Sequence, residues 1–250
     1  MNKTFIYTGA IALTLGLGFA PQSLNAQVTR QGSGFAMSLK LTKGATYKYM
    51  LNAVIDASAA MGGTAPKGQS AKQTMKSPIS MKVVDVKNGI STVQVTQTPP
   101  SMGGTAAKPQ TVTIKIDRTG KVTEGNEAGV MVSLPTKPVR IGETWTSTST
   151  TRGMGIPMQV TTKATLKAVR AAGGRQVAEI SVVTSAKGSG MSGTGKGSYT
   201  IDAKDGMIVS YNLVQTMNMT MPAQPAAAGS QTPAKPRTIS IPTTMTLTRQ

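Results

Sequence analysis

The sequence predicts an all-β fold, mainly antiparallel, built as a long curved sheet that is half-barrel or barrel-like. Three observations support this prediction: apolar and polar residues alternate over long stretches, short turn sequences separate the stretches, and one alternating stretch is much longer than an ordinary strand. Alternation places the apolar side chains on one face, which is expected to be buried. Because most strands are about 5 to 6 residues long, a much longer regular strand indicates a strongly curved sheet.

Four segments show the alternation most clearly. Residues 237–249 alternate Ile239, Ile241, Met245 and Leu247 with threonine and serine. Residues 207–221 alternate in the same way and would extend over about 50 Å at about 3.3 Å per residue. Shorter alternating runs occupy residues 158–168 and 111–117. Each of these segments is predicted to be a strand with one buried face.

Turn sequences connect the predicted strands. Asn88-Gly89 stands between two apolar runs and is the strongest hairpin signal in the chain. Asp117–Gly120, Gly173-Gly174 and Lys204–Gly206 are consistent with further tight turns. Residues 125–145 contain two prolines and cannot form a regular central strand.

The middle of the chain also allows one short helix, near residues Glu127–Ser133. The halves on either side align as two pseudo-repeats, residues 34–124 and 143–250. The turn at Gly173-Gly174 follows Asn88-Gly89 by 85 residues, since 173 − 88 = 85. A chance match between two β-rich halves explains the same spacing, and both interpretations remain open.

The N-terminal residues have the pattern of a secretion signal. Lys3 is followed by an apolar run, and Ala26 offers a small residue at a cleavage site. We therefore expect residues 1–26 to be removed and residues 27–250 to form a single β-rich domain, secreted or periplasmic. No later run approaches the ~20 apolar residues of a membrane-spanning helix, so the mature chain is not expected to span a membrane.

The composition argues against an enzyme. The chain has no His and no Cys, which removes imidazole and thiolate nucleophiles and the usual zinc ligands. Residues 190–197 nearly match a phosphate-binding loop, but Gly197 replaces the required hydroxyl residue and a predicted strand follows. A glycine-rich hairpin loop is the better interpretation of this segment. No catalytic residue and no cofactor are expected.

Residues 134–145, LPTKPVRIGETW, resemble the L-P-x-K-P-V-x-x-G-x-T-W core of a family of secreted bacterial proteins of unknown function. Residues 41–49 are similar to the opening strand of this family, and residues 117–122 to its mid-chain turn. The resemblance implies a β-rich fold outside the cytoplasm and carries no catalytic residues. By fold-level analogy, the layout is similar to open half-barrels that carry lipids and lipoproteins across the periplasm.

These features lead to the hypothesis of a non-enzymatic protein that binds an apolar ligand, either a lipid or a lipidated client, on a concave methionine-rich face. Unbranched methionine side chains adapt to ligands of irregular shape. The residues expected to line this face are Tyr47, Tyr49, Leu51, Val209, Leu213, Met217 and Met219. The alternative hypothesis is a structural or envelope-associated module whose sheet is filled by its own core.

Two further features bear on possible partners. Met217, Met219 and Met221 project from one strand face and form a second alternative, a site for Cu(I) or Ag(I). Core packing by the same methionines is the favoured interpretation, because methionines are spread along the whole chain. The formal charge of +18 is spread singly along the chain with few aromatic residues. This pattern argues against nucleic acid as a partner and leaves nonspecific attraction to an anionic envelope surface.

Overall fold

The computed structural model of the 250-residue chain describes residues 26–56, 58, 72–99, 108–125, 134–153, 156–172, 175–203, 208–221 and 237–250. These residues form two antiparallel sheets and, within these ranges, no helix. The strands are β1 (Ala26–Gln31), β2 (Gly34–Leu39), β3 (Thr46–Asp56), β4 (Lys72–Lys87), β5 (Ile90–Gln97), β6 (Gln110–Ile116), β7 (Val122–Glu124), β8 (Thr144–Gly153), β9 (Ile156–Ala172), β10 (Arg175–Gly188), β11 (Met191–Asp202), β12 (Ile208–Met221) and β13 (Arg237–Arg249).

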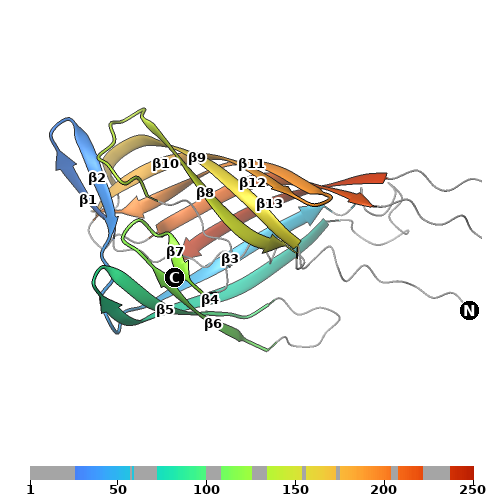
Figure 1. The fold of residues 1–250 in the computed structure, drawn as a ribbon, viewed down its shortest axis with the longest axis horizontal. Coiled ribbons are helices and arrows are strands. Elements are labelled where there is room, and N and C mark those ends of the chain that lie inside the picture. Colours follow the sequence, from blue (N-terminus) through green and yellow to red (C-terminus); the bar gives the residue numbers. More distant parts are fainter. Residues whose placement is uncertain are drawn as a thin grey trace, which may run out of the picture.

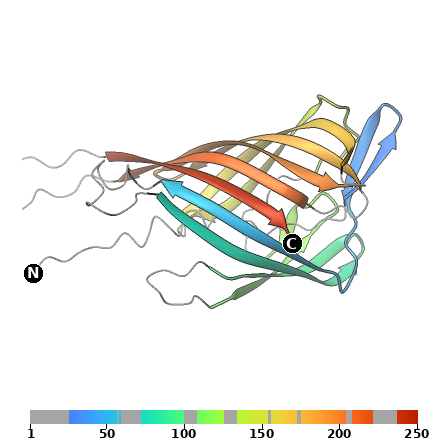
Figure 2. The same cartoon turned by 180° about the vertical axis from the view of Figure 1, so that it is seen from behind.

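The main sheet has eleven strands in the order β7-β6-β5-β4-β3-β13-β12-β11-β10-β9-β8. Two meanders of consecutive strands, β3 to β7 and β8 to β13, are joined where β13 pairs with β3. The sheet curves along its length, but its edges β7 and β8 do not pair with each other (Figures 1 and 2). The prediction of an all-β, antiparallel, half-barrel-like sheet is therefore confirmed, and the sheet is open.

The predicted strands and turns are present where the described residues include them. Residues 237–249 form β13, and the long segment predicted at 207–221 forms the 14-residue strand β12. Asn88 and Gly89 both have positive φ angles, 52° and 77°, and connect β4 to β5 as a tight hairpin turn. At the β6–β7 turn the Asp117 carboxylate accepts hydrogen bonds from the backbone N–H of Thr119 and Lys121.

The concave face of the main sheet is a closely packed core. One buried cluster contains residues from both sheets, and its largest fully buried side chains include Tyr49, Met81, Leu166, Ile180 and Leu247. Pairing across the sheet puts inward residues of neighbouring strands directly opposite one another, as with Leu51 and Leu247. The burial of these side chains supplies the main driving force for folding, at about 25 cal/mol per Å² of apolar surface.

Two details of the strands differ from the predictions. Thr200 pairs with Ser210 and Ile201 pairs with Ile208, so a β-bulge leaves Val209 without a partner on β11. The bulge turns Ile208 into the core and leaves Val209 only partly buried, so the prediction that Val209 continues the inward row was wrong. Residues 191–197 belong to β11, so the interpretation of the glycine-rich segment as a hairpin loop was wrong beyond Gly190.

The β1–β2 hairpin lies at one end of the main sheet, on the left in Figure 1. Phe35 on β2 exchanges two backbone hydrogen bonds with Val139, at 2.8 and 3.0 Å, and the N–H of Leu39 donates to the carbonyl of Arg118. Gly34 lies so close to Pro138 and the Val139 carbonyl that an added Cβ would be 3.3 Å from both. The hairpin therefore holds both the β6–β7 turn and the segment that enters β8.

Several predictions concern residues that the structure does not describe. They include most of the signal segment at 1–26, the short helix at Glu127–Ser133, and the turns at Gly173-Gly174 and Lys204–Gly206. Within the described ranges, no helix has the length and apolar character needed to cross a membrane.

Candidate functional site

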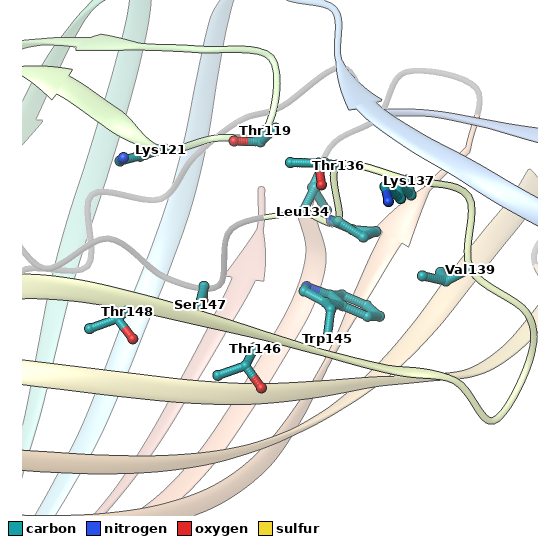
Figure 3. A pocket seen from close by; sticks show the side chains of 11 residues that line it. Thr119, Lys121, Leu134, Thr136, Lys137, Val139, Trp145, Thr146, Ser147 and Thr148 are labelled. Atoms are coloured by element: carbon teal, nitrogen blue, oxygen red, sulfur yellow. The ribbon is translucent and has the colours of Figure 1, made fainter.

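A pocket of about 370 Å³ lies between the two open edges of the sheet. Its walls come from the β6–β7 turn, from the first residues of β8, and from residues 134–139, which we call the crossover segment (Figure 3). The lining residues are Thr119, Lys121, Leu134, Pro135, Thr136, Lys137, Val139, Trp145, Thr146, Ser147 and Thr148. The volume lies within the range of about 300–1,000 Å³ that is usual for small-molecule sites.

Trp145, the single tryptophan of the chain, forms the apolar floor of the pocket. It lies opposite Ala164 of β9, which is fully buried, so its ring is on the inner face of β8 and packs against the core. Figure 3 shows the ring between β8 and the crossover segment, with Leu134 on its far side. The ring is only partly buried, and therefore an aromatic surface is available to a ligand in the pocket.

The crossover segment is fixed by backbone hydrogen bonds at both ends. The N–H of Leu134 donates to the carbonyl of Thr119 at 2.7 Å, and the N–H of Val139 donates to the carbonyl of Phe35 at 3.0 Å. Leu134 and Val139 are buried, with 3% and 8% of their surface exposed, and anchor the segment to the core. Because Pro135 and Pro138 restrict the backbone between these anchors, the segment forms a firm wall.

Two lysines give the pocket a positive rim. Lys121 follows the β6–β7 turn, and Lys137 belongs to the crossover segment; both are exposed. Among the described residues no Asp or Glu lines the pocket, and the remaining polar lining residues are Thr119, Thr136, Thr146, Ser147 and Thr148. An apolar floor beneath a cationic, hydroxyl-rich rim has the chemistry to hold an amphiphile with an anionic head group.

Four of the seven residues predicted to line a ligand site belong to the main core or pack against it. Tyr49, Leu51 and Leu213 are buried in the main core, with at most 4% of their surface exposed, and Tyr47 packs against that core. Val209 lies at the bulge described above. The described part of the concave face is therefore occupied by its own side chains.

Met217 and Met219 belong to a second, smaller buried group. We call it the methionine cluster: Met158, Met191 and Met217, with Met219 packed against them and with Ala186 and Val160 as neighbours. The strand bearing Met221 is described but its side chain is not, so the predicted array of three methionines on one strand is tested only at Met217 and Met219. The structure adds Met158 and Met191 from β9 and β11.

A line of polar residues crosses the inner face beside this cluster. Directly paired residues on β8, β9, β10, β12 and β13 form what we call the polar row: Ser147, Thr162, Thr184, Gln215 and Thr243. Gly195 of β11 completes the row between Thr184 and Gln215. Gln215 Nε2 and Thr243 Oγ1 are buried and make no hydrogen bond in the described part of the chain. The row begins at Ser147, which also lines the pocket.

The segment that builds the pocket was recognisable in the sequence as a family motif but not as a site. Leu134, Pro135, Lys137, Val139 and Trp145 are all positions of the motif that carries the family resemblance, and all line the pocket. A sole tryptophan beside a proline-rich, lysine-bearing segment was the available signal. The contribution of the β6–β7 turn depends on long-range packing that local sequence patterns do not show.

Comparison with models of known protein families gives a match to part of the chain. Residues 124–208 match a family described as a family of unknown function (DUF6263). This segment contains the crossover segment, all of β8 to β11, and the first residue of β12. No curated protein matches the chain. In the described ranges, no group of three or more His, Cys, Asp or Glu side chains could hold a metal ion.

Proposed function

We propose that this protein is a non-enzymatic binding protein, exported from the cytoplasm, that holds a single amphiphile with an anionic head group in the pocket between β8 and the β6–β7 turn. The observation that carries the proposal is the pairing of the Trp145 floor with the two lysines of the rim. The apolar part of the ligand would lie against Trp145 and Leu134. Its head group would lie beside Lys121 and Lys137.

The proposed ligand site lies between the two open edges of the sheet and not on its concave face. Burial of Tyr49, Leu51 and Leu213 leaves little room on the concave face unless the core opens, which would expose apolar surface to water. The pocket needs no such rearrangement, since its volume is already present between firm walls. A preformed pocket avoids the cost of ordering its walls on binding.

The intrinsic fluorescence of Trp145 provides a direct test, because no other tryptophan contributes to the signal. We expect dodecanoate and dodecyl phosphate, each below its micellar concentration, to change the emission saturably. Dodecyltrimethylammonium should have no such effect, because it repels the lysine rim. Absence of any saturable change, together with a blank calorimetric titration, would remove the proposal and favour a sheet that serves only as a structural module.

A matched pair of variants separates specific binding from general charge. Lys121→Gln/Lys137→Gln should weaken dodecyl phosphate binding by about threefold to tenfold, since exposed ion pairs contribute about 0.2–1 kcal/mol each. Lys82→Gln/Lys87→Gln removes the same charge from exposed positions on β4, outside the pocket lining, and should leave the affinity unchanged. Equal weakening by both pairs would contradict binding in the pocket.

A second candidate, association with an anionic envelope surface, is favoured by a row on the outer face. Lys163, Val183, Lys196 and Val214 are paired in sequence across β9 to β12, and all four are exposed. Exposed valines between lysines suit contact with a surface that is both anionic and partly apolar. Sedimentation with vesicles containing phosphatidylglycerol should fall as salt rises, and should fall further for Lys163→Gln/Lys196→Gln.

A further inference from the structure

The methionine cluster brings side chains from three different strands together at one place on the inner face. Met191 of β11 lies directly opposite Met219 of β12, and Met217 is two residues from Met219 on the same face. Met158 joins from β9, two strands away from Met191, and packs in the same buried group. Four thioether groups therefore share one small region of the sheet.

Glycines on the strands between these methionines allow them to approach one another. Gly188 of β10 pairs with both Met158 and Met191, and a Cβ added to Gly188 would lie 2.9 Å from Met158 Cγ. Met158 thus extends over the bare backbone of Gly188. Met217 likewise extends over the backbone of Gly193, because its Sδ occupies the space that a Cβ at position 193 would need. Side chains at these two positions would separate the methionines.

The polar row separates most of the methionine cluster from the main core. On β9, Thr162 lies between Val160, which packs against the cluster, and Ala164 of the main core. On β10, Thr184 lies between Ala186 of the cluster and Val182 of the main core. On β12, Gln215 stands between Met217 and Leu213. If the methionines only extended the apolar core, no buried polar residue would be needed at this boundary, where an unpaired polar group costs about 1–3 kcal/mol. On β13 the cluster remains continuous with the main core, because Ile241 and Ile239 lie opposite Met217 and Met219.

We propose that Met158, Met191, Met217 and Met219 form a binding site for a soft monovalent metal ion of the Cu(I) and Ag(I) class. Thioether sulfur is a neutral, soft ligand that suits such ions, whereas Mg²⁺ and Ca²⁺ prefer oxygen donors. Met158, Met191 and Met217 are at most 5% exposed, and Met219 is partly exposed. The ion would enter past Met219 and be shielded from water by the other three methionines.

Titration of the mature protein with Ag(I) alone tests this site, because Ag(I) needs no reductant. With ¹³C-methyl-labelled methionine, we expect four methyl signals to shift together and to saturate at one equivalent of Ag(I). The variant Met191→Leu/Met217→Leu should bind Ag(I) at least about tenfold more weakly, since two of the four ligands are lost. Leucine conserves the volume and apolar character of methionine, so the fold should be retained.

The chain supplies a matched control in two methionines of the main core. Met81→Leu/Met245→Leu removes the same number of thioethers from fully buried positions outside the cluster and should bind Ag(I) as the wild type does. If the double variant in the cluster does not fold, Met219→Leu, at a partly exposed position, should still weaken binding. The proposal is overturned if wild-type protein takes up no Ag(I), if cluster and control variants bind equally, or if the shifted methyl signals belong to other methionines.

Discussion

Met217 of β12 extends over Gly193 of β11, the residue directly opposite it, and its sulfur fills the space that a side chain at position 193 would need. On the same strand, a Cβ added to Gly195 would meet the side chains of Thr184 and Leu213. A Cβ added to Gly197 would meet the backbone of β12. Gly193, Gly195 and Gly197 thus serve close packing within β11. Glycine is unfavourable in a strand interior unless a neighbour approaches its backbone closely, as happens here.

Substitution of Gly193 by alanine should destabilise the protein, because Met217 must leave its place. We expect the free energy of unfolding to fall by about 1–3 kcal/mol, the usual cost of overpacking a core. Urea denaturation measures the change. Ser192→Ala, at the exposed neighbouring position on β11, should alter it by less than about 0.5 kcal/mol. Combining Gly193→Ala with Met217→Ala should cost less than the sum of the two single changes, and strict additivity would contradict the contact.

The hairpin between β4 and β5 depends on the left-handed backbone of Gly89. Its φ angle is 77°, and an added Cβ would lie 2.9 Å from Nε of Arg118. Gly89→Ala should therefore lower the free energy of unfolding by about 1–2 kcal/mol, the cost of placing an L-residue in this conformation. Thermal and urea denaturation both report it. Adding Arg118→Ala to Gly89→Ala removes the side-chain contact. Any recovery of unfolding free energy measures the contribution of that contact, and no recovery means that the loss comes from the backbone conformation.

The bulge on β12 predicts opposite results at two adjacent residues. Ile208 has 4% of its surface exposed, and truncation to alanine should cost about 2–5 kcal/mol of unfolding free energy. Val209 is only partly buried, and Val209→Ala should cost less than about 1 kcal/mol. Denaturant unfolding of the two variants under one set of conditions distinguishes them. A larger loss at Val209 would mean that β12 alternates without a bulge.

Burial makes the stability of the fold sensitive to alkali. Desolvation raises the pKa of Tyr199 and of Tyr211 above the ordinary value of 10.0. Above about pH 10 the unfolded chain releases protons that the folded chain keeps, so the free energy of unfolding falls as pH rises, by up to about 1.4 kcal/mol per pH unit for each tyrosine. Below pH 10 this contribution to stability is fully retained.

Tyr199→Phe should reduce this alkaline loss and leave stability at neutral pH unchanged or higher, since the Tyr199 hydroxyl makes no hydrogen bond within the described residues. Urea denaturation at neutral and alkaline pH measures both effects, and tyrosinate absorbance follows the ionisation. Tyr47→Phe, at a partly buried position on β3, is the control and should preserve most of the alkaline loss. An identical alkaline loss in Tyr199→Phe and wild type would contradict the assignment.

Local patterns predicted the elements of this fold well, because strand periodicity and turn chemistry are short-range properties. Asn88-Gly89 and the alternation of residues 237–249 each specify their conformation within a few residues. The edges of the sheet were not predictable in this way. That β7 and β8 lie at the edges depends on the pairing of β13 with β3, which lie at opposite ends of the sequence.

The candidate site was harder to predict than the strands. Alternation identified the inward positions of Tyr49, Leu51 and Leu213, but periodicity is the same for a packed face and for a ligand-lined one. The bulge at Val209 carries no clear local signal. The pocket combines Thr119 and Lys121 of the first meander with Trp145 of the second. These residues come together only when the two meanders have assembled into one sheet.

The pairing of β13 with β3 also affects the order of events during synthesis and folding. The central strand β13 follows every other strand of the main sheet in the sequence, so the two meanders cannot be joined until β13 has been synthesised. Contacts between the ends of a chain form slowly, because the loop between them must be closed first. The main sheet therefore remains two separate meanders until β13 is available to join them.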